Sequence, residues 1–360
     1  MSDSTERLFT SVDLGGLRLP NRVVMAPMSR VRSTPEGLAT AAMAAYYAQR
    51  ASAGLIVTEG VHPNRVGQSN PLTPGLHTDE QTASWRQVTT AVHANGGRIF
   101  AQLMHGGRIS HPDTTGLQPV GPSAVAARDS RVFTPSGPQQ VPVPRALTTE
   151  EAGAQAAAFA HAARRAVAAG FDGVELHGAN GYLIAQFLSS SANLRTDRYG
   201  GPVSGRIRFA VEAATAAAAA IGPQRVGIRL SPGAGLWDAH DTEIPELYGA
   251  LLAELDPLGL AYLHLEATTD EQTLLGLRRA WSGPLIVNPS APSAPVPAGP
   301  KSAGHWLGLG ADLISFGRAF LANPDLVERL RIGLPLAEAD PATFYEGGDT
   351  GYLTYTPYRY

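Results

Sequence analysis

Eight short runs of β-branched and other apolar residues recur along the chain, and stretches of helical composition separate most of them. The expected strands are Arg22–Met28, Leu55–Glu59, Arg98–Leu103, Gly173–His177, Val226–Ser231, Tyr262–Glu266, Leu285–Asn288 and Leu313–Gly317. Strands that alternate with helices are typical of a parallel sheet, and eight such units can close a barrel. An open doubly wound sheet would usually show fewer strands and a glycine-rich first turn, which is absent here. The sequence therefore predicts an α/β fold, a (β/α)8 TIM barrel.

Helical patterns fill most of the spaces between these strands. The expected helices include Leu38–Ala53, Asp79–Asn95, Thr148–Ala169 and Gly205–Ala220. The third of them opens with a capping-box pattern, in which Glu151 follows Thr148 by three residues. This signature predicts where that helix begins.

Two segments fall outside the repeat. Leu8–Leu19 has the pattern of a hairpin around Gly15-Gly16 and is expected to cover the bottom of the barrel. His111–Arg145, between strands 3 and 4, is rich in proline, glycine and serine and is too long for an ordinary loop, so it is expected to be a capping insertion. Neither segment indicates a second domain, and residues 1–360 are expected to form a single barrel domain.

Composition excludes several classes of function. The 28 basic and 31 acidic residues give a net charge of −3, and no basic run could follow a phosphate backbone, which argues against nucleic acid. The absence of cysteine removes disulfides, thiolate metal sites and cysteine nucleophiles. No apolar stretch reaches membrane-spanning length, and Met1–Thr10 is polar. We expect a cytoplasmic monomer or homodimer that acts on a small molecule, with no metal and no membrane partner.

Polar groups stand at almost every predicted strand end. They are Ser29, Glu59, Gln102, His177, Arg229, Glu266, Asn288 and Arg318. Barrel enzymes place their chemistry at the C-terminal ends of the strands, and a purely structural barrel would not need so many hydrogen-bonding groups there. Glu59 and Glu266 are interpreted as structural and are left out of the predicted site.

The types of residue at these ends suit a flavin. Gln102 can bond the pyrimidine edge of an isoalloxazine ring, Arg229 can stabilise the anionic reduced form, and the hydroxyl of Ser29 can bond the ring oxygen O4. Barrels commonly hold a phosphate after strands 7 and 8, where Gly317 and Arg318 lie.

A second group suits the substrate. Alone, His177 would more often be a core histidine, but Asn180 and Tyr182 follow it closely at the mouth of the barrel. When hydride adds to an enone, negative charge develops on the carbonyl oxygen, and the side chains of His177 and Asn180 could donate to it. Tyr182, whose phenol stays protonated at neutral pH, could then give a proton to the α-carbon.

Several longer segments carry a family resemblance. They are residues 21–30 (NRVVMAPMSR), 102–108 (QLMHGGR), 174–183 (VELHGANGYL), 186–189 (QFLS), 193–201 (NLRTDRYGG) and 315–318 (SFGR). Together they resemble the Old Yellow Enzyme family over nearly the whole chain. The resemblance implies bound FMN, NADPH or NADH as the hydride donor, and ping-pong reduction of the activated C=C bond of an α,β-unsaturated carbonyl or nitro compound.

The same resemblance supports the site residues named above. The predicted catalytic residues are Tyr182, His177 and Asn180. The predicted cofactor-binding residues are Pro27, Met28, Ser29, Gly60, Gln102, Arg229, Asn288, Gly317 and Arg318.

The chain departs from the family pattern near the pocket. Proline-rich residues 288–297 replace a short glycine-rich phosphate loop, and proline has no N–H to offer a phosphate. We therefore expect the phosphate donors near Gly299–Ser302, beside Lys301. Met104 stands where many bacterial relatives have tryptophan, and Asn70 replaces an expected aromatic residue. With Tyr352 from the C-terminal tail, they form the predicted substrate pocket, which should accept bulky alkenes; packing away from the pocket is an equal alternative for Tyr352.

Other functions remain open at this level. A flavin-dependent tailoring enzyme could isomerise or oxidise a bulky natural-product intermediate without net use of NAD(P)H. A barrel glycosidase could use two of Glu59, Glu175 and Glu266 as its carboxylate pair, although Arg229 and Gln102 would then be unexplained. A non-catalytic flavin carrier would not need His177 with its neighbours.

Overall fold

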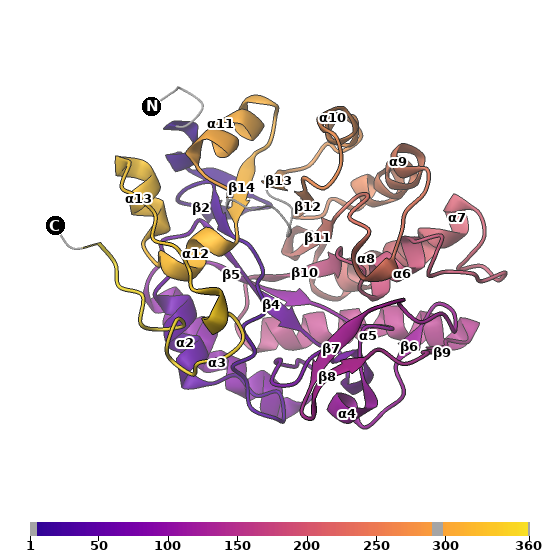
Figure 1. Cartoon of the computed structure of the whole chain (residues 1–360). Coiled ribbons are helices and arrows are strands. Elements are labelled where there is room, and N and C mark those ends of the chain that lie inside the picture. The colour runs from indigo at the N-terminus through magenta and orange to yellow at the C-terminus, as the bar shows by residue number, and fades with distance from the viewer. Residues whose placement is uncertain (1–5, 290–297, 359–360) are drawn as a thin grey trace.

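Eight parallel strands form a closed barrel in the computed structural model, which describes residues 6–289 and 298–358 (Figure 1). Neighbouring strands follow the chain order β3 (Val23–Met25), β4 (Leu55–Val61), β5 (Ile99–Leu103), β10 (Gly173–Gly178), β11 (Val226–Leu230), β12 (Tyr262–Glu266), β13 (Leu285–Asn288) and β14 (Leu313–Phe316). The predicted (β/α)8 barrel is confirmed. The first strand is shorter than predicted, since Pro27 cannot donate to a sheet ladder. Residues 26–30 are thereby left as a loop at the barrel mouth.

Helices surround the barrel. They are α2 (Ala41–Ala48), α3 (Asp79–Ala94), α5 (Thr149–Ala168), α6 (Leu183–Leu188), α7 (Val203–Arg206), α8 (Arg208–Ile221), α9 (Ile244–Leu255), α10 (Glu271–Arg279), α11 (Pro300–Gly308), α12 (Arg318–Ala322) and α13 (Leu326–Ile332). The capping box at Thr148 and Glu151 is present. The helix expected at Leu38–Ala53 is shorter, because the hydroxyl of Thr40 caps its first turn by accepting from the backbone N–H of Met43.

The N-terminal hairpin closes the bottom of the barrel, as predicted. It consists of β1 (Val12–Leu14) and β2 (Leu17–Leu19), which pair antiparallel. Leu14 and Leu19 are fully buried, and they pack in one cluster with Phe100 and Tyr262 from inside the barrel. This end of the barrel is therefore a packed core.

Two glycines make room for the aromatic rings in that core. A Cβ atom on Gly227 would collide with the ring of Tyr262, and one on Gly173 would lie 2.5 Å from the ring of Phe100. Because large and small residues alternate on neighbouring strands, the rings fill the bottom of the barrel. Space is left only at the opposite end, where the strands end.

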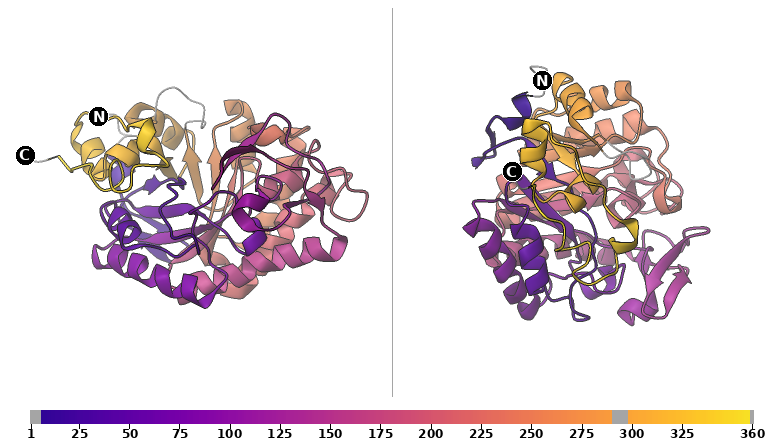
Figure 2. Two further views of the ribbon diagram at one scale, coloured as in Figure 1. Left: turned by 60° about the horizontal axis from the view of Figure 1, so that its bottom comes forward. Right: turned by 60° about the vertical axis from the view of Figure 1, so that its left-hand side comes forward.

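The insertion between β5 and α5 has structure of its own. It contains α4 (Pro112–Thr115), β6 (Val120–Gly121), β7 (Arg131–Thr134), β8 (Gly137–Gln140) and β9 (Arg145–Ala146). The β7–β8 hairpin and the segment after α13 approach each other over the mouth (Figure 2). The centroids of the Phe133 and Tyr345 rings are 6.3 Å apart there. Insertion and C-terminal segment therefore both border the entrance.

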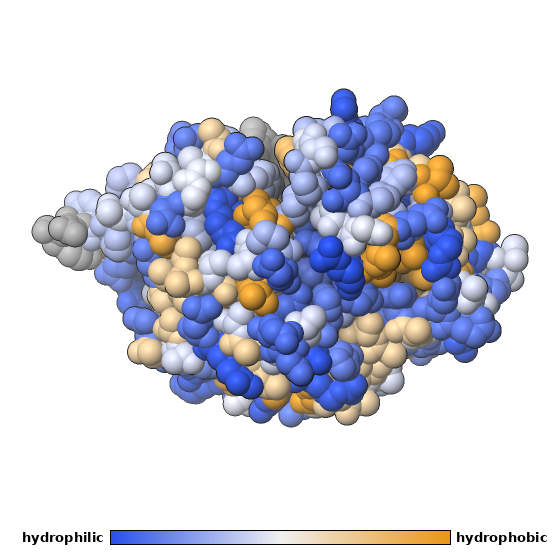
Figure 3. Space-filling view, turned by 90° about the horizontal axis from the view of Figure 1, so that it is seen from below, coloured by the Kyte–Doolittle hydropathy of each residue, from blue (hydrophilic) through white to orange (hydrophobic). Residues whose placement is uncertain are grey.

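Within residues 6–289 and 298–358, no helix combines the length and apolar character needed to cross a bilayer. The face in Figure 3 is mainly hydrophilic, and its hydrophobic side chains form small separate patches.

Candidate active site

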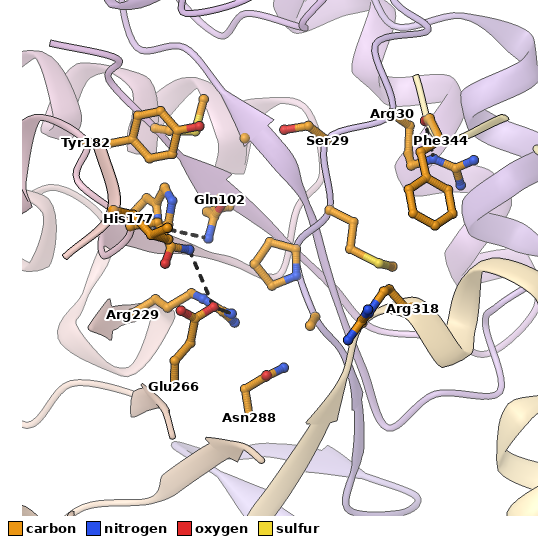
Figure 4. A pocket seen from close by; sticks show the side chains of 18 of the residues that line it. Ser29, Arg30, Gln102, His177, Tyr182, Arg229, Glu266, Asn288, Arg318 and Phe344 are labelled. Atoms are coloured by element: carbon orange, nitrogen blue, oxygen red, sulfur yellow. Dashed lines mark hydrogen bonds and ion pairs between the residues drawn. The ribbon is translucent and has the colours of Figure 1, made fainter. Parts of the chain in front are cut away.

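A cavity of about 440 Å³ lies at the C-terminal ends of the barrel strands. All nine predicted cofactor residues line it: Pro27, Met28, Ser29, Gly60, Gln102, Arg229, Asn288, Gly317 and Arg318. The predicted catalytic residues His177, Asn180 and Tyr182 line it as well. Figure 4 shows Ser29, Gln102, His177 and Tyr182 gathered at one end, with Arg318 toward the other. The cavity thus has a polar end suited to a ring and a cationic end suited to a phosphate.

Arg229 forms the floor of the polar end. Its guanidinium is buried, forms an ion pair with Glu266 and lies 2.8 Å from Nε2 of His264. The prediction that Glu266 lies outside the site is wrong, since Glu266 lines the cavity beside Asn180. Every second side chain of a strand lies on the same face, so His264 and Glu266 face the barrel interior together with Tyr262.

His177 is neutral at physiological pH. Burial lowers its pKa to about 3, and the positive charge of Arg229 adds to this effect. Nδ1 of His177 lies 3.4 Å from Nε2 of Gln102, which also donates to the carboxylate of Glu175 at 2.9 Å. An amide nitrogen can only donate, so Nδ1 must accept and the ring proton resides on Nε2. His177 therefore has an N–H available as a donor.

The orientation of the Gln102 side-chain amide depends on the negative charge of Glu175, to which its nitrogen donates. Burial alone would raise the pKa of Glu175, but neighbouring His264 and the charge of Arg229 bring it below the ordinary value. A carboxylate accepts hydrogen bonds, and so the side chain of Gln102 must turn its amide nitrogen toward it. By fixing the orientation of Gln102, the buried carboxylate of Glu175 determines which ring nitrogen of His177 carries the proton.

Asn180 sits in a left-handed backbone conformation, with φ of 56°. Its backbone N–H donates to Oγ of Ser231 at 2.8 Å, which holds the turn after β10. Its side-chain nitrogen lies 3.4 Å from Glu266, and that interaction occupies only one of its two N–H groups. The second N–H is available for a ligand in the cavity.

Tyr182 keeps its proton over the whole physiological range. Removal from water raises the pKa of its phenol to about 12, and neighbouring Tyr345 adds to the increase. The ring lies 5.2 Å from that of His177, between centroids. An acid and a neutral donor therefore stand side by side on one wall.

The predicted substrate-pocket residues have different outcomes. Met104 lines the cavity. Asn70 is not among the lining residues, because the loop folds back on itself and the amide of Asn70 donates to Ser69. Tyr352 is not at the mouth either: it is fully buried and stacks on Tyr46 at 4.2 Å between ring centroids. The placement of Asn70 corrects the sequence-based prediction, and that of Tyr352 follows the packing alternative and not the pocket.

Aromatic side chains from other segments form the walls instead. Trp237 comes from the loop after β11, and Phe344 and Tyr345 come from the C-terminal segment. Sequence reasoning missed all three. A tryptophan directly after the glycine-containing turn that follows strand five was an available signal for Trp237, but the tail residues gave none.

At the phosphate end of the cavity, the described residues include the segment from Ala298 onward and Arg318. The proline-rich stretch 290–297, which bears on the predicted phosphate loop, lies outside the described residues. Ala298 lines the cavity, and the backbone N–H of Gly299 donates to the hydroxyl of Ser302 at 3.1 Å. Lys301 is exposed and is not among the lining residues. Arg318 lines the cavity at this end.

The cavity fits the group that the sequence implies. Three buried polar atoms on its wall have no partner within the described part of the protein: Nε of Arg229, Oδ1 of Asn180 and Oε2 of Glu266. Buried polar atoms are nearly always hydrogen-bonded in native proteins, so unpaired atoms around one cavity indicate a polar ligand. A flat ring that carries both donors and acceptors on one edge, as isoalloxazine does, matches this mixed set.

Comparison with known proteins identifies the family. The model of the NADH:flavin oxidoreductase / NADH oxidase family matches residues 7–337. The chain belongs to this family. The predicted relationship to the Old Yellow Enzyme group is confirmed, and the protein is a flavin-dependent oxidoreductase. A glycosidase is thereby excluded.

Relatives and solved structures agree with this assignment over the whole length. A probable flavin mononucleotide-dependent alkene reductase of Leishmania infantum is 39% identical over 98% of both chains. The 12-oxophytodienoate reductase 1 of Oryza sativa subsp. japonica is 38% identical over 97% of this chain and 92% of its own. The structure of morphinone reductase superposes with a TM-score of 0.93 at 41% identity, covering 99% of this chain and 98% of that one.

Proposed function

We propose that this protein reduces the activated C=C bond of α,β-unsaturated carbonyl or nitro compounds, with FMN as its cofactor and NADPH or NADH as the hydride source. The observation that carries the proposal is the meeting of His177, Asn180 and Tyr182 with Arg229 and Gln102 in one cavity. The names of the relatives support it, because they include alkene and 12-oxophytodienoate reductases. A solved complex of morphinone reductase with tetrahydroNAD supports the nicotinamide.

The cofactor role falls to residues on the floor and at the far end of the cavity. When bound, FMN supplies hydride transfer. Arg229 would place a buried positive charge beside the pyrimidine part of the ring, and Gln102 and Ser29 would bond its polar edge. Arg318 would hold the phosphate. These assignments are proposals.

Two neutral donors would hold the substrate oxygen. The Nε2–H of His177 and the second side-chain N–H of Asn180 both belong to residues of the cavity wall. Since the imidazole stays neutral, it donates without adding a charge, as an oxyanion hole does. As negative charge grows on the substrate oxygen, both hydrogen bonds strengthen, and the transition state is stabilised more than the ground state.

Tyr182 would complete the reaction. Once the β-carbon has received hydride, the α-carbon needs a proton, and the phenol is protonated at every pH at which the enzyme would work. The O–H bond of Tyr182 breaks, a C–H bond forms at the α-carbon, and the phenolate regains its proton from solvent. General acid assistance of this kind is typically worth roughly 10²–10⁴-fold in rate.

A visible absorption spectrum and two anaerobic additions test the proposal. The purified protein is expected to be yellow and to release FMN on denaturation. NADPH or NADH should bleach the flavin, and 2-cyclohexenone should restore the colour. Bleaching without reoxidation by enones would favour the alternative, an isomerase or oxidase for a bulky natural-product intermediate. Protein that neither contains nor takes up FMN would contradict the proposal.

Three further expectations stay predictions. A cytoplasmic location follows from the composition of the sequence, and so does a small-molecule substrate without nucleic acid. A monomeric or homodimeric state is expected as well. Sedimentation of the purified protein measures this oligomeric state directly.

A further inference from the structure

The loop after β11 contains two consecutive strained residues. Trp237 and Asp238, within the short turn Leu236–Asp238, have backbone φ angles of 54° and 56°. Left-handed conformations of residues other than glycine are energetically costly and persist only where the surroundings enforce them. Two consecutive left-handed residues therefore indicate that contacts with other segments hold this loop in a defined position.

Side chains from other segments hold this loop in place. The guanidinium of Arg108 donates to the carbonyl oxygens of Trp237, at 3.0 Å, and Asp238, at 2.8 Å. The carboxylate of Asp238 pairs with Arg128 of the capping insertion at 2.8 Å. The hydroxyl of Ser191 donates to the carbonyl oxygen of Asp238 at 2.9 Å. Segments after β5, after β10 and within the insertion thus converge on this loop.

The loop lies directly against the turn that carries Tyr182. A Cβ atom on Gly181 would collide with the carbonyl oxygen of Leu236 and would lie 3.2 Å from Cβ of Trp237. Only glycine allows this approach. Trp237 and Tyr182 also pack on the same small apolar cluster, Ile109, Ala127, Val132 and Val141.

The indole of Trp237 lowers the pKa of the Tyr182 phenol as a hydrogen-bonding neighbour, and the two side chains pack on one apolar cluster. An indole can only donate, so in a hydrogen bond between these two side chains the phenol oxygen of Tyr182 is the acceptor. The hydrogen of the phenol must then point away from the indole, and both side chains line the active-site cavity.

We propose that Trp237 is a positioning residue for proton transfer: its indole N–H donates to the phenol oxygen of Tyr182 and directs the phenol proton toward the substrate. This inference deepens the proposed function and rests on it. The same N–H would stabilise the phenolate that remains after the proton has moved to the α-carbon. The loop after β11 and the capping insertion would then be part of the catalytic apparatus, although neither supplies a group that touches the reacting carbons.

The hydrogen bond can be tested by NMR without any turnover. The chain has four tryptophans, so ¹⁵N-indole labelling of the FMN-bound protein gives a simple spectrum. Trp237→Phe assigns the signal of Trp237 by its loss. In Tyr182→Phe, that signal should move upfield in the proton dimension, because the acceptor has gone. The indoles of Trp85 and Trp281, which donate to the carbonyl oxygens of Gly75 and Pro284, serve as internal controls and should stay in place.

A double-mutant cycle tests the catalytic part. In single-turnover reoxidation by 2-cyclohexenone, Trp237→Phe should slow the reaction roughly three- to tenfold, the range expected for one hydrogen bond. The same substitution in a Tyr182→Phe background should have no further effect. Leu236→Ala is the matched control, because it alters the same loop and cavity wall without removing a donor; its effect should be equal in both backgrounds.

The outcomes separate the two proposals. An unmoved Trp237 signal in Tyr182→Phe, or an equal cost of Trp237→Phe in both backgrounds, would overturn the positioning role and leave ene-reduction intact. A protein that fails to reduce any enone while the indole signal still moves would instead overturn the proposed function.

Discussion

At the scale of single residues, the phenol of Tyr182 should separate the two halves of the catalytic cycle. Tyr182→Phe removes the proton donor and is nearly isosteric, so reoxidation of the flavin by an enone should slow by roughly 10²-fold or more. Reduction of the flavin by NADPH needs no proton at carbon and should change little. Stopped-flow absorbance of each half-reaction measures both. Unchanged reoxidation would assign the proton to another group.

Glu59 should make stability depend on pH. Burial raises its pKa to about 7 from an ordinary value of 4.5, although the backbone N–H groups of Arg30 and Val31 oppose the increase. Between these values the native carboxyl keeps a proton that the unfolded chain has lost. The free energy of unfolding should therefore fall as pH rises from about 4.5 to 7, by up to about 1.4 kcal/mol per pH unit from this group.

Glu59→Gln should remove that contribution, since an amide does not titrate. Urea denaturation of both proteins at pH 5, 6 and 7 gives the difference between them, in which the other titrating groups cancel. A difference that is constant with pH would show that Glu59 stays ionised in the native state.

Met104 should influence substrate size. Its flexible side chain lines the cavity next to Gly60, where a Cβ atom would lie 2.6 Å from the sulfur of Met104. Met104→Trp would put a rigid wall there. We expect kcat/KM to fall selectively for a steroid-sized enone relative to 2-cyclohexenone. Equal responses of the two substrates would mean that position 104 does not limit the pocket.

At the scale of elements, the β1–β2 hairpin should contribute to stability rather than to catalysis. Leu19 is fully buried among residues of the barrel interior, far along the chain from most of its partners. Leu19→Ala should lower the free energy of unfolding by about 2–5 kcal/mol. KM and kcat should be retained, because the packed bottom separates the hairpin from the cavity. The exposed Leu194→Ala is a matched control that should cost little.

Elements also determine the walls of the pocket. At positions 104 and 70 the family pattern has aromatic residues, and this chain has Met104 and Asn70. Aromatic side chains from other segments, Trp237, Phe344 and Tyr345, line the cavity instead. The C-terminal segment is fixed by Arg30, whose guanidinium donates to the carbonyl oxygens of Phe344 and Gly351. The pocket is therefore less open than the sequence alone indicates.

At the scale of the whole molecule, FMN should stabilise the native protein by mass action. The unfolded chain has no cavity, so a ligand at 100 times its Kd adds about 2.7 kcal/mol to the free energy of unfolding. Thermal melts of stripped protein with added FMN should show a concentration-dependent rise in Tm. Riboflavin, which lacks the phosphate, should raise it less, and Arg318→Ala should reduce the advantage of FMN. Equal increases in Tm with FMN and with riboflavin would show that Arg318 does not bind the phosphate.

Local patterns of residue types were sufficient to predict the eight strands, the hairpin, the insertion and most of the site. Parallel strands bring their C-terminal ends to one edge, so the order of the strands alone assigns Ser29, Gln102, His177 and Arg229 to a single cavity. The motifs of the family then indicate the chemistry of that cavity.

Contacts between distant segments, in contrast, are visible only in the folded molecule. Glu266 forms an ion pair with Arg229 because of the register between β11 and β12, which the strand pattern alone does not give. Tyr352 leaves the site because its ring finds a stacking partner in Tyr46. Trp237 meets Tyr182 because a strained loop is held by side chains from other segments. Such contacts join residues far apart in the chain, and no local pattern of residue types encodes them.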